Sequence, residues 1–275
     1  MRGIQEEISQ GFFPLRNDSP LGLQPAPSRQ QVAPPRKQAS PTSNSGNKQT
    51  SSPGVAAENT KGVVTFSSLE QLQGGYSFEL RANIDRGKFV NITNWTIRTN
   101  RGEIKIPQAV SLYAPNYAPV FSDIVLGSGN VVSVSSGQSP LRNQASFRTN
   151  LCTGHLNRQF AFNPPLANEC PVPPRALYQG YPGWCQRYIM GLSSCELPDA
   201  NTTRMWEGRE GYLCRKFIDE HFSFFSCVRN SIARADFFGN RWHVWSGTNI
   251  NIFDPLHDWV RIYNKNGVLI DEHIY

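Results

Sequence analysis

Two runs of alternating apolar and polar residues close the chain, and a short turn signal separates them. The runs span residues 258–263 and 268–275, with Asn264-Lys265-Asn266-Gly267 between them. β-Branched and aromatic residues are frequent in both runs, which favours strands. Glycine adopts the left-handed backbone that a tight hairpin turn requires. The pattern therefore predicts a β-hairpin at the end of the chain.

The register of this hairpin follows from which loop length gathers apolar side chains on one face. A three-residue loop ending at Gly267 pairs Ile262 with Ile270 and Val260 with Glu272. A two-residue loop would place Ile262 opposite Asp271 instead, so we expect the three-residue loop. The predicted buried face carries five aliphatic residues: Val260, Ile262, Val268, Ile270 and Ile274.

Short β-rich runs also follow one another between Gly62 and Ser136, separated by turn signals. They are residues 62–66, 76–84, 90–100, 103–107, 123–126 and 131–136. Closely spaced short strands with no long helix between them are typical of an all-β sandwich. We expect Trp95 at the contact between two sheets, with the apolar face of the hairpin packed against its sheet. The strands stop after Ser136, and β structure returns at residues 236–245.

A cysteine-bearing segment separates the two β regions, and two helices are predicted in it. They span 184–195 and 210–227, with turn-forming residues 198–201 between them. Eight aromatic residues lie in or beside this segment, and we interpret them as a small core of its own rather than a stacking surface for sugars or bases. They are Tyr178, Tyr181, Trp184, Tyr188, Trp206, Phe222, Phe224 and Phe225.

The six cysteines of the chain all lie between Cys152 and Cys227, and their even number predicts three disulfides in an oxidising compartment. The ten-residue spacing from Cys185 to Cys195 spans about 15 Å on a helix, which is too far for a disulfide within it. Two antiparallel helices favour bonds between them. The predicted pairs are Cys185 with Cys227, Cys195 with Cys214, and Cys152 with Cys170.

Composition changes sharply near residue 60. Residues 1–60 are rich in Pro, Ser, Gln and Asn and poor in bulky apolar residues, which predicts a disordered linker. We expect one β-rich domain at 61–275, interrupted by a cysteine-rich helical insert at about 150–232. No stretch approaches the 18 apolar residues of a membrane span, and the first residues lack a signal-peptide pattern. We expect the signal or anchor for export to lie outside this sequence.

A net charge of +6 permits contact with anionic partners. The basic residues are scattered, and an anionic-polymer interface would have to draw on four arginines: Arg142, Arg148, Arg158 and Arg175.

The sequence predicts no catalytic residues, no cofactor and no metal. Ser136-Gly137-Gln138-Ser139 does not match a nucleophile motif and indicates a turn. Asp254, His257 and Asp258, with His243 from a nearby strand, could share a metal, but we interpret them as residues that cap a loop. The cysteines lack the close CxxC pairs of structural zinc sites.

Three segments resemble the lamin-tail-domain-like proteins of small-genome candidate-phylum bacteria. They are VNITNWTIRTNRGEIKIP at 90–107, VVSVSS through CPVPP at 131–174, and WVRIYNKNGVLIDEHIY at 259–275. The resemblance covers residues 62–275. It implies an immunoglobulin-like β-sandwich, held by a linker and an N-terminal anchor on the outer side of the cytoplasmic membrane. It implies no activity for particular residues.

These observations favour a non-enzymatic, extracytoplasmic binding or scaffold module whose partner is a protein or an envelope polymer. One alternative is a module that binds DNA or an anionic cell-wall glycan. A second is an envelope hydrolase with its site between the insert and the sandwich.

Overall fold

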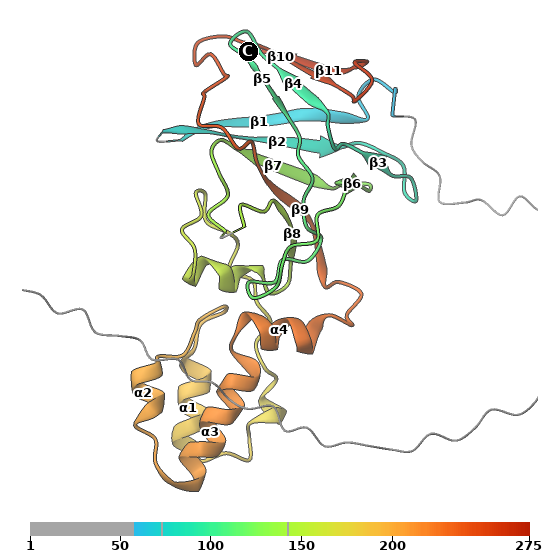
Figure 1. Ribbon diagram of the computed structural model, residues 1–275. Coiled ribbons are helices and arrows are strands. Elements are labelled where there is room, and N and C mark those ends of the chain that lie inside the picture. The colour runs from blue at the N-terminus through green and yellow to red at the C-terminus, as the bar shows by residue number, and fades with distance from the viewer. Residues whose placement is uncertain (1–57, 73, 142) are drawn as a thin grey trace, which may run out of the picture. The chain divides into compact units, whose positions relative to one another are not determined.

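A computed structural model of the chain describes residues 58–72, 74–141 and 143–275. The described part is β-rich, with two principal sheets, a few short helices and three disulfides (Figure 1). The predicted linker, residues 1–60, lies outside the described residues except for its last three.

The larger sheet has five strands in the order β1-β2-β7-β9-β8. Neighbouring strands are antiparallel except β7 and β9, which are parallel. β9 therefore joins the sheet beside a strand that lies far before it in the sequence. The five strands are β1 (Val64–Leu72), β2 (Gly75–Ala82), β7 (Val131–Ser135), β8 (Phe147–Asn150) and β9 (Phe238–Trp245).

The second sheet is antiparallel, in the order β11-β10-β4-β5, and a two-stranded sheet pairs β3 with β6. The sheets share one hydrophobic core, in which Trp95 is fully buried with residues of β2, β7 and β10. The expected central position of Trp95 is confirmed. The hairpin was expected to pack against the sheet of Trp95, but this is wrong, because β10 pairs with β4 directly after Trp95 and extends that sheet. These strands are β3 (Val90–Asn91), β4 (Thr96–Arg98), β5 (Glu103–Lys105), β6 (Val125–Leu126), β10 (Trp259–Tyr263) and β11 (Leu269–Ile274).

The closing hairpin forms as predicted, but most of its predicted register is wrong. At the turn, Asn264 N–H donates to Val268 O, so the loop has three residues and Gly267 is left-handed. One strand position further, the register shifts, and Ile262 lies opposite Asp271. The irregularity adds a residue on β11 and turns Ile270 into the core beside Ile262. Beyond the shift the predicted partners no longer match.

Two of the five residues of the predicted apolar face are exposed. Val268 lies at the end of the loop, 38% exposed, and Ile274 lies beyond the shift, 71% exposed. Val260, Ile262 and Ile270 are fully buried. Burial of these three fixes the hairpin to the core.

The structure contains one strand where the sequence predicted none. β8 pairs with β9, and Phe147 lies opposite His243. Its partner is about 90 residues away, at the far end of the cysteine-bearing segment, so local sequence does not reveal it. The predicted end of β structure at Ser136 is therefore wrong.

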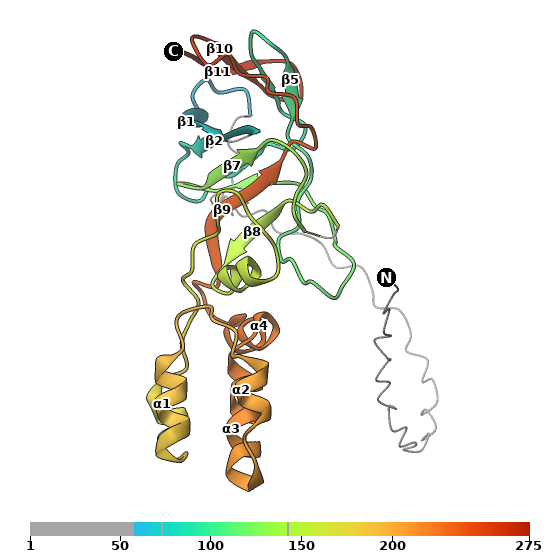
Figure 2. The same ribbon diagram turned by 90° about the vertical axis from the view of Figure 1, so that its left-hand side faces the viewer.

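Helical turns occupy the cysteine-bearing segment, and the second predicted helix is divided in two. Ser223 and Ser226 form a reciprocal capping box, each side chain bonded to the other's backbone N–H, which ends one helix and starts the next. Helices α1 and α3 lie side by side (Figures 1 and 2). The elements are η1 (Thr153–Arg158), η2 (Arg175–Leu177), α1 (Gly183–Gly191), α2 (Ala200–Arg204), α3 (Gly208–His221) and α4 (Phe224–Ser231).

All six cysteines are paired, as predicted, but all three predicted pairings are wrong. The observed bonds are Cys152–Cys227, Cys170–Cys195 and Cys185–Cys214. Because α1 ends at Gly191, Cys195 lies outside it; because the chain breaks before α4, Cys227 is not on α3. A single bond, Cys185–Cys214, joins the two long helices, and the other two fasten the segment that precedes them.

Substitutions at buried and at exposed positions of the hairpin should have very different effects on the free energy of unfolding. Replacing Ile262, fully buried, with alanine should lower the free energy of unfolding by about 2 to 5 kcal/mol. The same substitution at Ile274, on the same hairpin but 71% exposed, should change it by less than about 0.5 kcal/mol. Chemical denaturation of both variants measures the contrast. Equal losses would contradict the shifted register.

The disulfide connectivity can be mapped directly, because trypsin separates all six cysteines into different peptides. Digestion without reduction, followed by mass spectrometry, should yield three linked pairs. The expected pairs are 149–158 with 217–229, 159–175 with 188–204, and 176–187 with 210–215. A link between 176–187 and 217–229 would instead show the Cys185–Cys227 bond expected from the sequence and contradict the structure.

Candidate binding cleft

The outer face of the five-stranded sheet is polar where its inner face is apolar. On β2, Phe78 and Leu80 enter the core, whereas Ser77 and Glu79 face the other way. Strands β7 and β9 alternate in the same manner. Because side chains alternate along a strand, one sheet supplies both the core and a polar floor. The floor residues of β7 and β9 are Ser133, Arg241 and His243.

A cleft of about 600 Å³ lies over this floor. Its opposite wall comes from the chain between Asn150 and Glu169, including Pro164, Pro165 and Ala167. A volume of this size accommodates a small molecule or a few residues of a polymer.

A three-residue polar network forms the centre of the floor. Nη1 of Arg241 donates to Oε1 of Glu79 and to Oγ of Ser133, and the Ser133 hydroxyl also lies 3.4 Å from Oε1 of Glu79. Charge-assisted bonds of this kind fix side-chain positions firmly. Among the described residues, these bonds use Nη1 of Arg241 and Oε1 of Glu79, and no bond is found for Nε or Nη2 of Arg241 or for Oε2 of Glu79.

His243 extends the floor towards β8. Burial lowers the pKa of His243 to about 4, the charge of Arg241 acts in the same direction, and Glu79 opposes them. Its ring lies 5.7 Å from the ring of Phe147 and 6.3 Å from that of Trp245, measured between centroids. His243 is therefore neutral at pH 7 and adds no charge to the floor.

The wall of the cleft is fastened at both ends and in its middle. Cys152 bonds to Cys227 of α4, and Cys170 bonds to Cys195. Between these points the Asn157 side chain donates to Leu166 O (2.7 Å) and accepts from Leu166 N–H (3.0 Å). This two-way clamp and the two disulfides hold the wall in place over the floor.

The charges of the cleft favour neutral or cationic ligands. Glu70, Glu79, Glu169 and Asp236 line it, and Arg241 is the one cation among the lining residues described. An anionic polymer would meet an excess of carboxylates here. Hydroxyl, amide and carboxylate groups together suit a ligand rich in hydrogen-bond donors.

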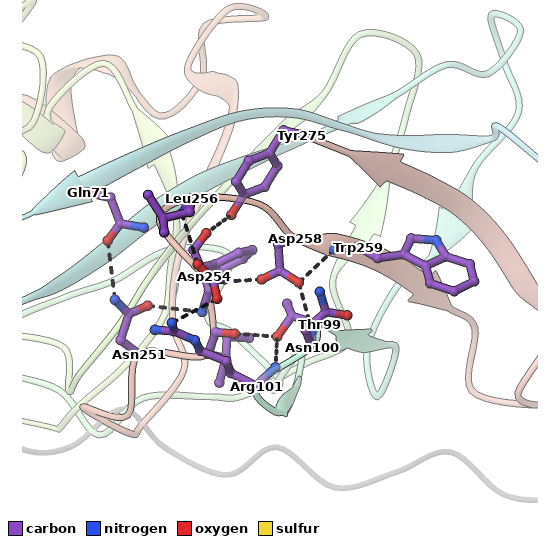
Figure 3. A network of polar contacts seen from close by, with 12 residues as sticks. Gln71, Thr99, Asn100, Arg101, Asn251, Asp254, Leu256, Asp258, Trp259 and Tyr275 are labelled. Carbon is purple, nitrogen blue, oxygen red and sulfur yellow. Dashed lines mark hydrogen bonds and ion pairs between the residues drawn. The ribbon is translucent and has the colours of Figure 1, made fainter.

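The loop residues considered as metal ligands belong to a structural network instead (Figure 3). Asp258 is 1% exposed and accepts three backbone N–H bonds, from Asn100, Asp254 and Trp259. Asp254 accepts from Leu256 N–H and pairs with Arg101. The loop-capping interpretation of the two aspartates is confirmed.

Of the two histidines considered with them, His257 contributes its backbone N–H to the Asp254 carboxylate. His257 is exposed, and His243 lies on β9 in the cleft floor. Within the described residues, no three His, Cys, Asp or Glu side chains are grouped so as to hold a metal ion.

The serines at 136 and 139 also have structural roles. The Ser136 hydroxyl accepts from Tyr76 N–H, and that of Ser139 donates to Ala145 O. Gly137 between them is left-handed, as a turn requires.

The four arginines considered for an anionic partner are not gathered by the structure. Arg142 lies outside the described residues. Arg148 stacks on Phe238 and Trp242, and its Nε donates to Gly239 O, so it is used within the fold. Arg158 and Arg175 are exposed on η1 and η2.

The aromatic residues of the helical segment pack largely as predicted. Tyr178 and Phe222 are buried beside the Cys185–Cys214 bond, with Tyr181, Trp184, Tyr188 and Trp206 packed against them. Phe224 joins a second cluster that includes Phe147 of β8. Phe225 remains 39% exposed.

Glu79, Ser133 and Arg241 of the floor were not predicted as site residues, and His243 was considered only as a metal ligand. Serine and charged residues alternating with buried aliphatics in 76–82 and 131–135 were the available signal. That pattern indicates a polar sheet face. It does not indicate which strands lie side by side, and the parallel pairing of Ser133 with His243 was therefore not visible.

Comparison with models of protein families, with curated proteins and with solved structures finds no match to this chain. None of the helices in the described ranges combines the length and the apolar character needed to cross a membrane.

The lowered pKa values of His155 and His243 predict a loss of stability in mild acid. The pKa of His243 is about 4 in the folded protein and about 6.5 when unfolded, so between these values only the unfolded state is protonated. Lowering the pH from 6.5 to 4 should therefore lower the free energy of unfolding, with up to about 3 kcal/mol from this residue.

The His243→Gln variant isolates this contribution. Its unfolding free energy, measured by denaturant titration at pH 7 and pH 4.5, should fall less between the two than that of the parent. His155, also with a pKa lowered to about 4 by burial, still titrates in the variant and keeps part of the effect. An unchanged pH dependence would contradict the burial of His243.

Proposed function

We propose that this chain is a non-enzymatic, extracytoplasmic binding module that holds its ligand in the cleft over the five-stranded sheet. The proposal includes an immunoglobulin-like, lamin-tail-like sandwich as its framework. Its main support is the cleft itself: a polar floor on a rigid sheet, enclosed by a wall that two disulfides fasten. Binding sites built on rigid elements keep their geometry without the ligand.

The extracytoplasmic part of the proposal draws on the cysteines. All six form disulfides, which persist in oxidising compartments and are rare in the cytosol.

The non-enzymatic part draws on the chemistry of the floor. A serine nucleophile needs a base that can take its proton. The hydroxyl of Ser133 instead lies within hydrogen-bond distance of Glu79, which forms an ion pair with Arg241. The neighbouring His243 packs against aromatic rings. These contacts favour a site that binds rather than one that cleaves.

Blocking the cleft should abolish binding without disturbing the floor. Ala167 is exposed on the wall, and Ala167→Trp would fill the space over the network. Thermal unfolding is followed with neutral oligosaccharides, amino acids and polyamines as probes. A ligand at a hundredfold excess over its Kd stabilises by about 2.7 kcal/mol, which is on the order of 5 to 10 °C for a domain of this size. This shift should occur in the parent and be lost in the variant.

Ala161→Trp is the matched control. Ala161 is exposed on the same segment but does not line the cleft, so its variant should keep the shift. A probe that stabilises all three proteins equally would place its site elsewhere and contradict the proposal.

A further inference from the structure

The outer face of the four-stranded sheet carries aromatic and cationic side chains in alternation. On β10, Val260 and Ile262 are fully buried, so Trp259, Arg261 and Tyr263 lie on the opposite face. Trp259 is 41% exposed. The two rings are four positions apart, or about 13 Å along the strand. This face is distinct from the cleft, which lies on the other sheet.

Two arginines lie directly opposite each other at the centre of this face. Arg261 of β10 pairs in register with Arg98 of β4, and like charges opposite each other destabilise a sheet. Carboxylates flank them: Glu103 lies opposite Arg98, and Glu272 lies opposite Arg261. The row therefore reads acid, base, base, acid across the sheet.

The two flanking glutamates interact differently with the two arginines. Nε and Nη2 of Arg98 donate to Oε2 of Glu103, at 2.9 and 2.7 Å. Glu272 forms its ion pair with Lys61, accepts a hydrogen bond from the Trp259 side chain and is also attracted by the charge of Arg261. Among the residues described, Arg261 has no ion-pair partner, and its Nε has no hydrogen-bond acceptor. Its guanidinium lies 4.4 Å from the centroid of the Trp259 ring.

A hollow of about 250 Å³ adjoins this row at Tyr263. Three cations line it, Arg98, Lys105 and Lys265, together with side-chain amides and the Tyr263 ring, and no carboxylate is among its described lining residues. Lys265 pairs with Glu58 at 3.2 Å, whereas Lys105 has no ion-pair partner in the described part of the chain. Lys105 therefore offers unpaired N–H donors to an incoming group, beside Arg98 and Lys265, which share their charges with Glu103 and Glu58.

We propose that this face binds an acidic glycan along β10, with a carboxylate of the glycan in the hollow of Arg98, Lys105 and Lys265 and sugar rings over Trp259. Aromatic rings pack against the apolar faces of sugar rings, and sugar hydroxyls both donate and accept hydrogen bonds. In the row, the arginines can donate hydrogen bonds to sugar hydroxyls, and the glutamates can accept them.

The carboxylates of the row are the reason for choosing a glycan over a nucleic acid. A nucleic acid carries a phosphate on every unit, so a strand along β10 would bring phosphates against Glu103 or Glu272. A glycan with a charge on every second sugar can place its anion in the hollow and neutral units beside the glutamates. The site is independent of the cleft proposed above.

The test uses hyaluronan fragments, which carry one carboxylate on every second sugar, with the full chain. Lys105 and Lys265 are changed together to glutamine. At about 50 mM salt the double variant should bind hyaluronan at least tenfold more weakly than the parent, because it loses two of the three cations of the hollow. Trp259→Ala should weaken binding at least fivefold. Binding to neutral dextran should be much weaker than to hyaluronan.

Two controls separate this site from general charge and from the cleft. Lys88 and Lys216 are exposed and ion-paired elsewhere, and their double change to glutamine removes the same charge. This control and Ala167→Trp should each bind hyaluronan within twofold of the parent. Lys105→Arg, which keeps the charge, should retain binding, and thermal unfolding confirms that each variant is folded.

Three results would overturn the proposal. The first is undetectable hyaluronan binding by the parent at low salt. The second is an equal loss in the two double lysine variants. The third is tighter binding of an oligo-dT strand that depends on the same three residues, which would assign the face to single-stranded nucleic acid.

Discussion

A single buried carboxylate holds the terminal hairpin in the place that the fold requires. Asp258 receives backbone N–H groups from the β4–β5 turn at Asn100, from the preceding loop at Asp254 and from its own strand at Trp259. A buried charge is tolerated only when such donors surround it. Three segments thus meet at one side chain, and backbone bonds to Tyr275 add the end of the chain. The position of β10, and with it both the core and the arginine row, depends on this arrangement.

The two candidate sites both arise because side chains alternate between the two faces of a sheet. Each site lies on the outer face of one of the two sheets. On the larger sheet the outward residues sit under a fastened wall, and the result is an enclosed cleft with an excess of carboxylates. On the smaller sheet the outward residues are uncovered, and the result is an open surface with exposed rings and cations. The chain can therefore offer opposite charge preferences on two sides of one core.

Local patterns were sufficient for some features and not for others. The turn at Gly267, the burial of Trp95 and the pairing of all six cysteines follow from neighbouring residues and an even count. The irregularity that adds a residue to β11 beside Ile270 does not follow from local sequence, because it depends on how the hairpin packs against the core. The predicted disulfide pairs were wrong because both helices were predicted to continue further along the chain than they do. The first helix ends at Gly191, and the second is interrupted at the Ser223 cap. The cleft floor joins strands about a hundred residues apart, and no local pattern encodes that pairing.

The parallel pairing of β7 with β9 also affects the nascent chain. About a hundred residues separate the two strands, so at roughly 5 to 20 residues per second β7 leaves the ribosome on the order of 5 to 20 s before its partner exists. During that time one hydrogen-bonding edge of β7 has no native neighbour, and such an edge can pair with another chain. The helical segment and all six cysteines are synthesised within the same interval. The order of synthesis thus leaves this sheet edge open until the whole cysteine-bearing segment has been made.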